Sequence, residues 1–335
     1  MILVTGGLGF IGSHTVVDLL NNGEDIIVID NLCNSKIEVK DNIEKITNKT
    51  FKLYIGDILD KNILNNIFKN NNIDLVIHFA GLKAVGESTK IPLDYYRNNV
   101  VGTCNLLEVM KENNCKNIIF SSSATVYGLQ EKQPISEDAV LQEPTNAYGR
   151  SKFFIEYILK DLYNSDNDWN IVLLRYFNPI GAHESALIGE DPKGIPNNLM
   201  PYITQTAFGL RECLSVFGDD YNTKDGTGVR DYIHVCDLAR GHRYAMKDIK
   251  EKNGLNIYNL GTGTGYSVLD VVNTFMKVNN VNVPYKVVER RAGDLAVCYA
   301  DPSKAFEKLG FKCEKNLEDM CIDSWRWEKY NRNNL

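Results

Sequence analysis

The sequence lacks the features of several protein classes. No apolar run in its 335 residues approaches the ~20 residues that a membrane-spanning helix needs. The eight cysteines include no C-x-x-C pair, and the five histidines form no cluster at metal-ligand spacing. The net charge is −6, which argues against a nucleic-acid partner. We therefore expect no membrane span, no structural disulfides and no bound metal.

What remains is the composition of a globular enzyme. Hydrophobic residues make up 44% and charged residues 24% of the chain, and the length suits one large or two modest domains. The short apolar run at the start has no basic segment before it, so we expect no secretory signal. Scattered cysteines without pairing are typical of reduced thiols. These features predict a cytoplasmic protein.

The first residues combine a buried strand with a glycine turn. Residues 2–4 are apolar, Gly7, Gly9 and Gly12 match G-x-G-x-x-G, and residues 13–20 have a helical pattern. Without Cβ atoms, such a turn lets backbone N–H groups approach a pyrophosphate at the N-terminus of a helix. Alone, this motif is weak evidence, and an ordinary glycine-rich turn is the alternative.

The next strand strengthens the interpretation. Residues 24–29 predict a second strand that ends in Asp30, 18 residues after Gly12. This is close to the ~20-residue offset at which an acidic side chain meets the adenosine ribose in dinucleotide-binding folds. A carboxylate accepts hydrogen bonds from a 2′-hydroxyl and repels a 2′-phosphate, and no arginine lies near Asp30 in the sequence. NAD is therefore expected rather than NADP.

Strands and helices then alternate along the chain. Further strands are expected at residues 51–57, 74–81, 117–123 and 170–175, with helical segments between them. This alternation predicts an α/β fold with a doubly wound parallel sheet of the Rossmann type, which binds ligands beyond the carboxyl ends of its strands. Asp57, Ala80, Gly81 and Ser123 follow or end these strands.

Prolines and glycines become frequent after residue 178. We expect a Rossmann-type dinucleotide-binding domain over residues 1–177 and a smaller, mixed α/β substrate domain over residues 178–335, from which some segments return to the first domain. Residues 261–265 (GTGTG) could form a second dinucleotide loop. A strand-to-helix turn is preferred, because Ser267 and Asp270 match a capping box and no acid follows at the required distance.

Tyr148 and Lys152 are candidates for catalysis. Four residues apart, they share one face of a predicted helix. A lysine cation beside a tyrosine is expected to lower the pKa of the phenol from ~10 toward the working pH, so that Tyr148 can take a proton from a sugar hydroxyl. The Tyr-x-x-x-Lys spacing is common by chance. It gains weight from Ser123, which could hydrogen-bond the same reacting oxygen.

With these residues the chain resembles the extended short-chain dehydrogenase/reductase superfamily and, within it, the UDP-galactose 4-epimerase family. The resemblance spans nearly the whole length. It is carried by residues 5–14 (TGGLGFIGSH), 30–35 (DNLCNS), 78–88 (HFAGLKAVGES), 121–128 (SSSATVYG), 174–179 (LRYFNP), 194–201 (GIPNNLMP) and 225–235 (DGTGVRDYIHV).

The resemblance implies an NAD site and a UDP-sugar site. NAD would contact Gly6, Gly9, Phe10, Ile11, Gly12, Asp30, Asn31, Leu32, Cys33, Asn34, Ser35, Asp57, Ile58, Phe79, Ala80, Gly81, Lys83, Asn98, Ser123, Tyr148, Lys152 and Phe177. The UDP-sugar would contact Ser123, Tyr148, Asn178, Asn198, Leu199, Ser215, Phe217, Arg230, Arg291, Asp294 and Cys298. Arg230 and Arg291 would meet the diphosphate, because guanidinium groups match phosphate oxygens. Without the resemblance, Arg290 and Arg291 would be read as a solvated surface pair.

The implied activity is interconversion of UDP-glucose and UDP-galactose. Tyr148 would take the C4-hydroxyl proton, NAD would accept the C4 hydride, and the keto sugar would turn and take the hydride back on its other face. Lys152 would activate Tyr148, and Ser123 would contact the sugar. Relatives of this kind are commonly homodimers, so a homodimer is expected.

Two other functions stay open at this point. Nucleotide-sugar 4,6-dehydratases and decarboxylases share most of these motifs, although they usually carry a carboxylate beside Ser123, where this chain has Ala124, Thr125 and Val126. A catalytically silent NAD-binding regulator is the other alternative, and the intact Tyr148 and Lys152 argue against it.

Cys298 is expected to set the breadth of substrates. In the family, the matching position lines the sugar pocket near C2, and a small residue there leaves room for an acetamido group. This implies activity on UDP-GlcNAc and UDP-GalNAc as well. A buried cysteine without a role is the alternative, as is a one-residue shift of the match that would make Tyr299 face the sugar instead.

Overall fold

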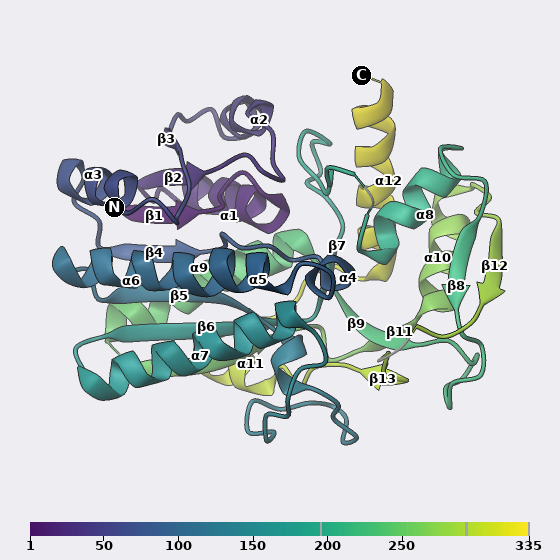
Figure 1. The fold of residues 1–335 in the computed structure, drawn as a ribbon. Helices are drawn as coiled ribbons and strands as arrows, with labels where there is room; N and C mark the ends of the chain where they lie inside the picture. Colours follow the sequence, from purple (N-terminus) through teal and green to yellow (C-terminus); the bar gives the residue numbers. More distant parts are fainter. Residues whose placement is uncertain (195, 253, 292–293, 334–335) are drawn as a thin grey trace.

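The first part of the molecule is built on a seven-stranded parallel sheet (Figure 1). The structure is a computed structural model that describes residues 1–194, 196–252, 254–291 and 294–333. In spatial order the strands are β10 (Leu255–Leu260), β6 (Asn170–Tyr176), β5 (Asn117–Ser123), β4 (Leu75–His78), β1 (Ile2–Thr5), β2 (Ile26–Asp30) and β3 (Lys52–Ile55). All neighbours pair in parallel. The predicted doubly wound α/β fold is confirmed.

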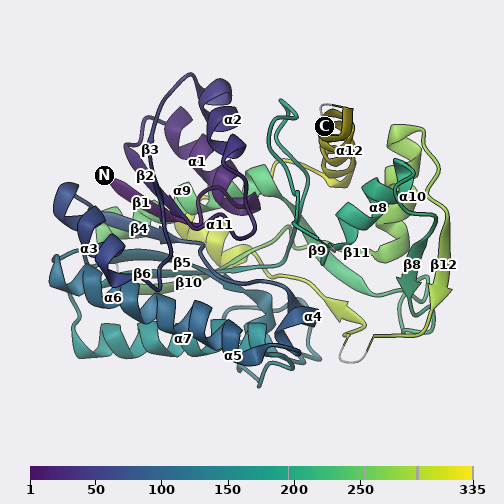
Figure 2. The ribbon, with the colours of Figure 1, turned by 45° about the horizontal axis from the view of Figure 1, so that its top comes forward.

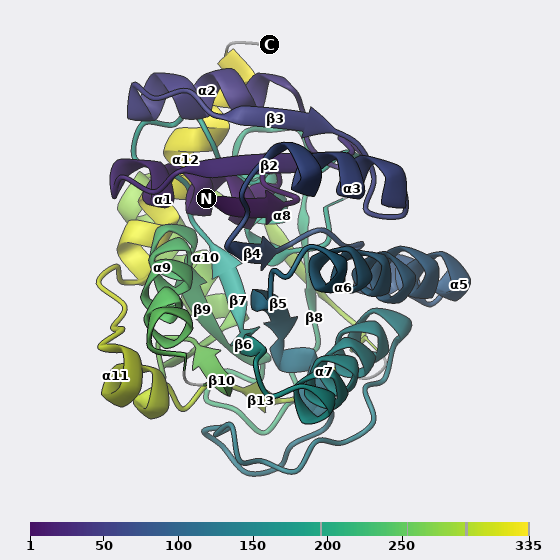
Figure 3. The same ribbon diagram turned by 90° about the vertical axis from the view of Figure 1, so that its left-hand side faces the viewer.

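Helices cover both faces of this sheet, as the end-on view in Figure 3 shows. One face packs against α1 (Phe10–Asn21), α2 (Glu38–Thr47), α9 (Val235–Glu251) and α11 (Ser303–Leu309), and the other against α3 (Lys61–Asn70), α6 (Gly102–Glu112) and α7 (Ala147–Ser165). Successive strand residues point to opposite faces, so Val4 and Val28 join one core and Leu3 and Ile27 the other. Because both faces are covered, the inner strands are apolar without alternation.

Shorter helices lie in the connections that follow β4 and β5. They are α4 (Val85–Ser88), α5 (Pro92–Tyr95), the π-helix η1 (Tyr96–Val101) and the 3₁₀ helix η2 (Ala124–Tyr127). Among the described residues, none of the helices combines the length and the apolar character required to cross a bilayer.

The second part of the chain builds smaller sheets beside the first (Figure 2). A four-stranded sheet contains β7 (Asn178–Ile180), β9 (Val229–His234), β11 (Gly265–Ser267) and β13 (Val297–Cys298), and β8 (Leu214–Phe217) pairs with β12 (Tyr285–Val288). Helices α8 (Leu199–Ala207), α10 (Val268–Asn279) and α12 (Leu317–Asn333) pack on them around a third apolar cluster. The sequence did not predict β10, which returns from this part to the edge of the large sheet.

The glycine-rich segment 261–265 connects β10 to β11, and Ser267 begins α10 with a capping box, as expected. The N–H groups of Thr262 and Gly263 both donate to the buried carboxylate of Asp231, at 2.8 and 2.9 Å. An internal anion therefore satisfies the donors that a nucleotide phosphate would need.

Candidate active site

The glycine turn is formed by contacts that exclude side chains. Gly6 lies in the left-handed region (φ 68°), and a Cβ there would approach the backbone nitrogen of Ala80 to 2.8 Å. A Cβ on Gly12 would lie 2.2 Å from the Gly6 carbonyl oxygen. Phe10 and Ile11 open α1, where backbone N–H groups lack partners within the helix. The turn thus brings β1, β4 and the N-terminus of α1 together.

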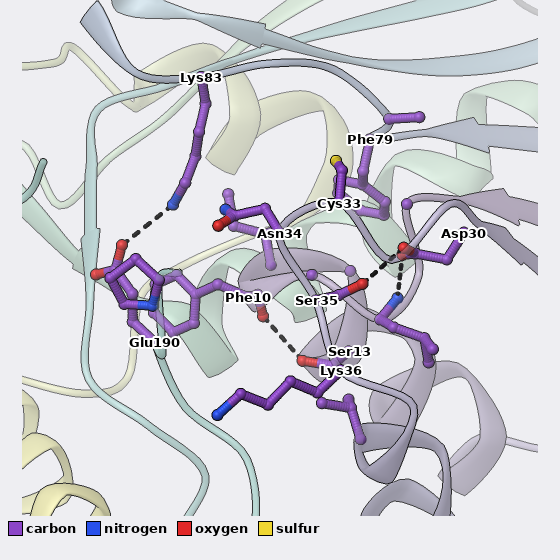
Figure 4. Close-up of a pocket in the computed structure, with 18 of the residues that line it drawn as sticks. Phe10, Ser13, Asp30, Cys33, Asn34, Ser35, Lys36, Phe79, Lys83 and Glu190 are labelled. Carbon is purple, nitrogen blue, oxygen red and sulfur yellow. Dashed lines mark hydrogen bonds and ion pairs between the residues drawn. The ribbon is translucent and has the colours of Figure 1, made fainter. Parts of the chain in front are cut away.

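Asp30 ends β2 beside this turn and organises the loop that follows. Its Oδ2 accepts from the Leu8 N–H at 3.0 Å, and its Oδ1 accepts from the Ser35 hydroxyl at 2.7 Å (Figure 4). Oδ1 also accepts from the Leu32 N–H at 2.9 Å. A carboxylate offers about four lone-pair positions. One position on Oδ2 therefore remains for a further donor.

A cavity of about 580 Å³ runs from Asp30 to Tyr148 and Lys152. Of the predicted cofactor residues, its walls contain Gly6, Gly9, Phe10, Ile11, Gly12, Asp30, Asn31, Cys33, Asn34, Ser35, Ile58, Phe79, Ala80, Gly81, Lys83, Asn98, Tyr148 and Lys152. Leu32, Asp57 and Phe177 are adjacent in sequence to lining residues but are not themselves in the walls, and Ser123 lies two residues beyond the lining residue Ser121. Asp57 instead accepts from the Asn31 side chain at 2.9 Å and so supports the loop after β2.

The sequence analysis missed one wall of the cavity, the segment 187–192. Glu190 pairs with Lys83 at 3.1 Å (Figure 4), and Asp191 pairs with Lys36 at 2.5 Å. The Trp327 indole of α12 donates to the Glu190 carbonyl oxygen at 3.3 Å. The segment thereby joins the second part of the chain to the predicted cofactor residues. In the sequence, only the adjacent acidic residues Glu190 and Asp191 hinted that this segment pairs with lysines of the first part.

Helix α7 carries the candidate catalytic pair. The helix begins at Ala147, where the Asn146 side chain accepts from the Gly149 N–H at 2.8 Å. The Lys152 ammonium donates to the Ser121 carbonyl oxygen of β5 at 2.8 Å and lies over the Phe120 ring. Further along the same face, Glu156 is buried and binds Arg175 of β6 through two hydrogen bonds. These contacts fix α7 against β5 and β6.

The expectation that Lys152 lowers the pKa of Tyr148 is wrong for this structure. Burial raises the pKa of the Tyr148 phenol above its usual value, and only the hydrogen bond with Ser123 opposes the rise. Burial also lowers the pKa of the Lys152 ammonium to about 8. Sequence spacing indicated that the two residues share a face, but burial of both groups dominates their ionisation.

Apart from Ser123 and Tyr148, the predicted substrate residues lie in the second part of the chain, outside the walls of this cavity. Asp294 lies between the two arginines, 3.1 Å from Arg291 and 4.0 Å from Arg230. The Arg291 guanidinium covers the Phe217 ring at 4.6 Å, and Ser215 precedes Phe217 by two residues on β8. Arginine, acid and aromatic side chains from three separate segments thus form one cluster.

Three further predicted residues lie near the boundary of the two parts. Asn178 opens β7, two residues after Tyr176 ends β6, and Leu199 is the first residue of α8. The Asn198 side chain donates to the Glu190 carboxylate at 2.6 Å. Glu190 therefore contacts one predicted substrate residue and one predicted cofactor residue, Lys83.

Cys298 pairs with Arg230 across β13 and β9 and packs on a buried cluster that contains Tyr127 and Phe177, against which Ala124 also packs. Ala124 directly follows Ser123. Tyr299 is oriented differently, since its ring lies near Gly265. Of the two neighbours, Cys298 is thus the one that packs on the cluster with Tyr127 and Phe177.

Comparison with known proteins identifies the family. The family model described as GDP-mannose 4,6 dehydratase matches residues 3–324. A UDP-glucose 4-epimerase of Bacillus subtilis is 57% identical, with 99% of this chain and 98% of that protein covered. The chain belongs to the UDP-glucose 4-epimerase family. This confirms the resemblance found in the sequence.

Solved structures of this epimerase family have the same fold. The UDP-glucose 4-epimerase from Bifidobacterium longum, in complex with NAD+ and UDP, superimposes with a TM-score of 0.96 at 53% identity, covering 100% of this chain and 99% of that one. The UDP-Glc/GlcNAc 4-epimerase from Campylobacter jejuni gives a TM-score of 0.85 at 36% identity, covering 98% and 99%. Epimerases named for different substrates therefore share this architecture.

Proposed function

We propose that this protein is an NAD-dependent epimerase that interconverts UDP-glucose and UDP-galactose. The observation that carries the proposal is the single cavity that joins the glycine turn and Asp30 at one end to Tyr148 and Lys152 at the other. The membership of the UDP-glucose 4-epimerase family supports the same activity.

The residues of the cavity fit NAD. The turn at Gly6 and Gly12 has no space for side chains, as expected where a backbone approaches a pyrophosphate. The free acceptor position on Asp30 suits a ribose hydroxyl, and its charge disfavours a 2′-phosphate. When bound, NAD would take up the hydride from sugar C4 and return it to the opposite face.

The chain's own residues would carry the proton and hold the substrate. Tyr148 would take the proton of the C4 hydroxyl, and Ser123 would share the hydrogen bond to that oxygen. Arg230 and Arg291 would hold the diphosphate by charge-assisted hydrogen bonds, while the sugar has few polar contacts and can turn. The proposal divides the chain into an NAD part (residues 1–177) and a UDP-sugar part (178–335). Strand β10 comes from the second range but completes the large sheet of the NAD part.

We also infer that Cys298 admits N-acetylated sugars. The small Cys298 thiol leaves more room for an acetamido group than a tyrosine side chain would, and the Campylobacter relative is named as a UDP-Glc/GlcNAc 4-epimerase. Turnover of UDP-GalNAc by the wild-type protein tests this directly, and inactivity toward that substrate alongside full activity on UDP-galactose would refute it.

We infer a homodimer from one exposed apolar face. Leu93 of α5, Val101 of η1, and Phe154 and Tyr157 of α7 are 79, 48, 44 and 47% exposed, and these elements pack against one another. An aromatic, apolar face of this kind is typical of an interface. Light scattering coupled to gel filtration should give twice the chain mass for the wild type and a lower mass for Phe154→Asp. A cytoplasmic location stays a prediction.

The activity itself is tested without added cofactor. Purified protein is incubated with UDP-galactose, and the nucleotide sugars are separated. UDP-glucose as the product supports the proposal. A 4-keto-6-deoxy product would indicate the dehydratase alternative, and bound NAD without any turnover would indicate the regulator.

A further inference from the structure

Residues 190–193 (EDPK), called the strap from here on, border the cofactor cavity, and the reaction described above gives them no role. The first three of them line the cavity. They have no regular secondary structure and belong to the second part of the chain. The preceding Gly189 packs against α12 so closely that a Cβ there would lie 2.5 Å from the Trp327 ring. Asn198, at the start of α8, donates to the Glu190 carboxylate at 2.6 Å.

Two ion pairs connect the strap to loops on opposite sides of the glycine turn. Asp191 pairs at 2.5 Å with Lys36, in the loop that follows β2. Glu190 pairs at 3.1 Å with Lys83, in the loop that follows β4 (Figure 4). Strands β2 and β4 are the two neighbours of β1, which runs into the glycine turn. The strap therefore spans the cavity at the turn, where the proposed function places the pyrophosphate.

The contacts of the strap with the first part of the chain are weak ones. The Lys193 ammonium donates to the Leu32 carbonyl oxygen at 2.6 Å, and the Lys193 N–H donates to the Asn34 side chain at 3.2 Å. The side chains of Lys36 and Lys83 are 43 and 40% exposed, so water and salt compete for their ion pairs. The strap is thus packed on the second part but joined to the first part by contacts that solvent can replace.

We propose that opening of the strap limits how fast NAD enters and leaves the cavity, an inference that rests on the proposed NAD-dependent function. A dinucleotide on the glycine turn is enclosed between the turn and the strap, so it leaves only when the strap separates from the first part. Asp191 and Lys36 bind each other, and neither is among the residues expected to contact NAD. Loss of their ion pair therefore speeds entry and release together, and the dissociation constant, which is the ratio of the two rate constants, stays the same.

The experiment measures both rates with NADH, whose fluorescence reports binding. Rapid mixing of NADH with protein freed of nucleotide gives the rate of uptake, and displacement of bound NADH by excess NAD gives the rate of release. Asp191→Asn and Lys36→Met break the same exposed ion pair, so each should speed both rates about two- to fivefold at an unchanged dissociation constant. Asp168→Asn is the matched control, because it breaks an exposed pair with Lys116 that precedes β5 and β6, and it should change neither rate.

The two variants also separate gating by the strap from electrostatic steering. Asp191→Asn removes a negative charge and Lys36→Met a positive one, so steering of an anionic nucleotide would speed uptake in the first and slow it in the second. A gating strap speeds uptake in both. Opposite changes in uptake, unchanged rates in both variants, or faster release with a matching rise in the dissociation constant would overturn the inference. Wild-type protein that binds no NADH would instead refute the proposed function.

Discussion

Replacement of Asp30 tests whether this carboxylate only selects the cofactor or also builds its site. Asp30→Ala removes the acceptor of three hydrogen bonds, from the Leu8 N–H, the Leu32 N–H and the Ser35 hydroxyl. It also removes the charge that faces the expected 2′-hydroxyl. Leu32 has a left-handed backbone (φ 57°), which the bond to Asp30 helps to hold.

The magnitude follows from the number of bonds. A hydrogen bond to a charged group contributes about 1.5–3 kcal/mol. Loss of three such bonds therefore destabilises the ordered turn and loop by at least about 4 kcal/mol. Expressed as binding, about 4 kcal/mol is a thousandfold. We therefore expect Asp30→Ala to lose NAD affinity by about that factor and to discriminate less against NADP.

Two milder variants separate the contributions. Ser35→Ala removes one bond and keeps the charge, so it should weaken NAD by about tenfold and keep the preference over NADP. Asp30→Asn keeps the shape but removes the charge. It also turns an N–H₂ donor toward the N–H donor of either Leu8 or Leu32, so one of these hydrogen bonds is lost. Calorimetric titration of all variants with both nucleotides is the measurement. NAD affinity within tenfold of the wild type for Asp30→Ala, together with new NADP binding, would show that Asp30 selects but does not organise.

Three other variants probe the remaining parts of the site. Tyr148→Phe should lower turnover by about 10²–10⁴-fold, while UDP binding by calorimetry is unchanged; near-normal initial rates would mean that another group takes the proton. Glu156→Gln leaves Arg175 buried without its counter-charge and should cost about 3–5 kcal/mol in urea unfolding, against at most about 1 kcal/mol for the exposed Glu143→Gln. Equal urea midpoints for these two variants would contradict the view that the Glu156–Arg175 pair fixes α7 against β6. Cys298→Tyr should abolish turnover of UDP-GalNAc and retain turnover of UDP-galactose, and parallel loss of both would assign Cys298 to packing.

Local sequence signals predicted the elements that depend on neighbouring residues. The glycine turn, the end of β2 at Asp30 and the bounds of β5 at residues 117–123 follow from apolar runs and glycine spacing. The i, i+4 spacing likewise put Tyr148 and Lys152 on one face of α7. In each case the physical cause lies within a few residues of the chain, and a single sequence contains it.

Features that depend on distant contacts could not be predicted. The strand β10 is a short, mixed segment that joins the large sheet only because β6, about 80 residues earlier, offers it an edge. The segment 187–192 is irregular, and its position over the cavity depends on ion pairs with Lys36 and Lys83. The expectation of a lowered Tyr148 pKa failed for the same reason. The i, i+4 spacing places Tyr148 and Lys152 on one helix face, but burial of both groups depends on distant contacts.

The two glycine-rich turns show why a motif needs its tertiary surroundings to acquire a function. At Gly6–Gly12, the donors of the α1 N-terminus face a cavity, and the nearby carboxylate of Asp30 retains an acceptor position. At residues 261–265, the N–H groups of Thr262 and Gly263 already bind Asp231, which is fully buried. A phosphate at the second turn would have to displace a carboxylate that is held by four donors, including the Ala300 N–H. The same glycine chemistry thus binds a ligand where the chain leaves donors free and fixes the fold where the chain supplies its own anion.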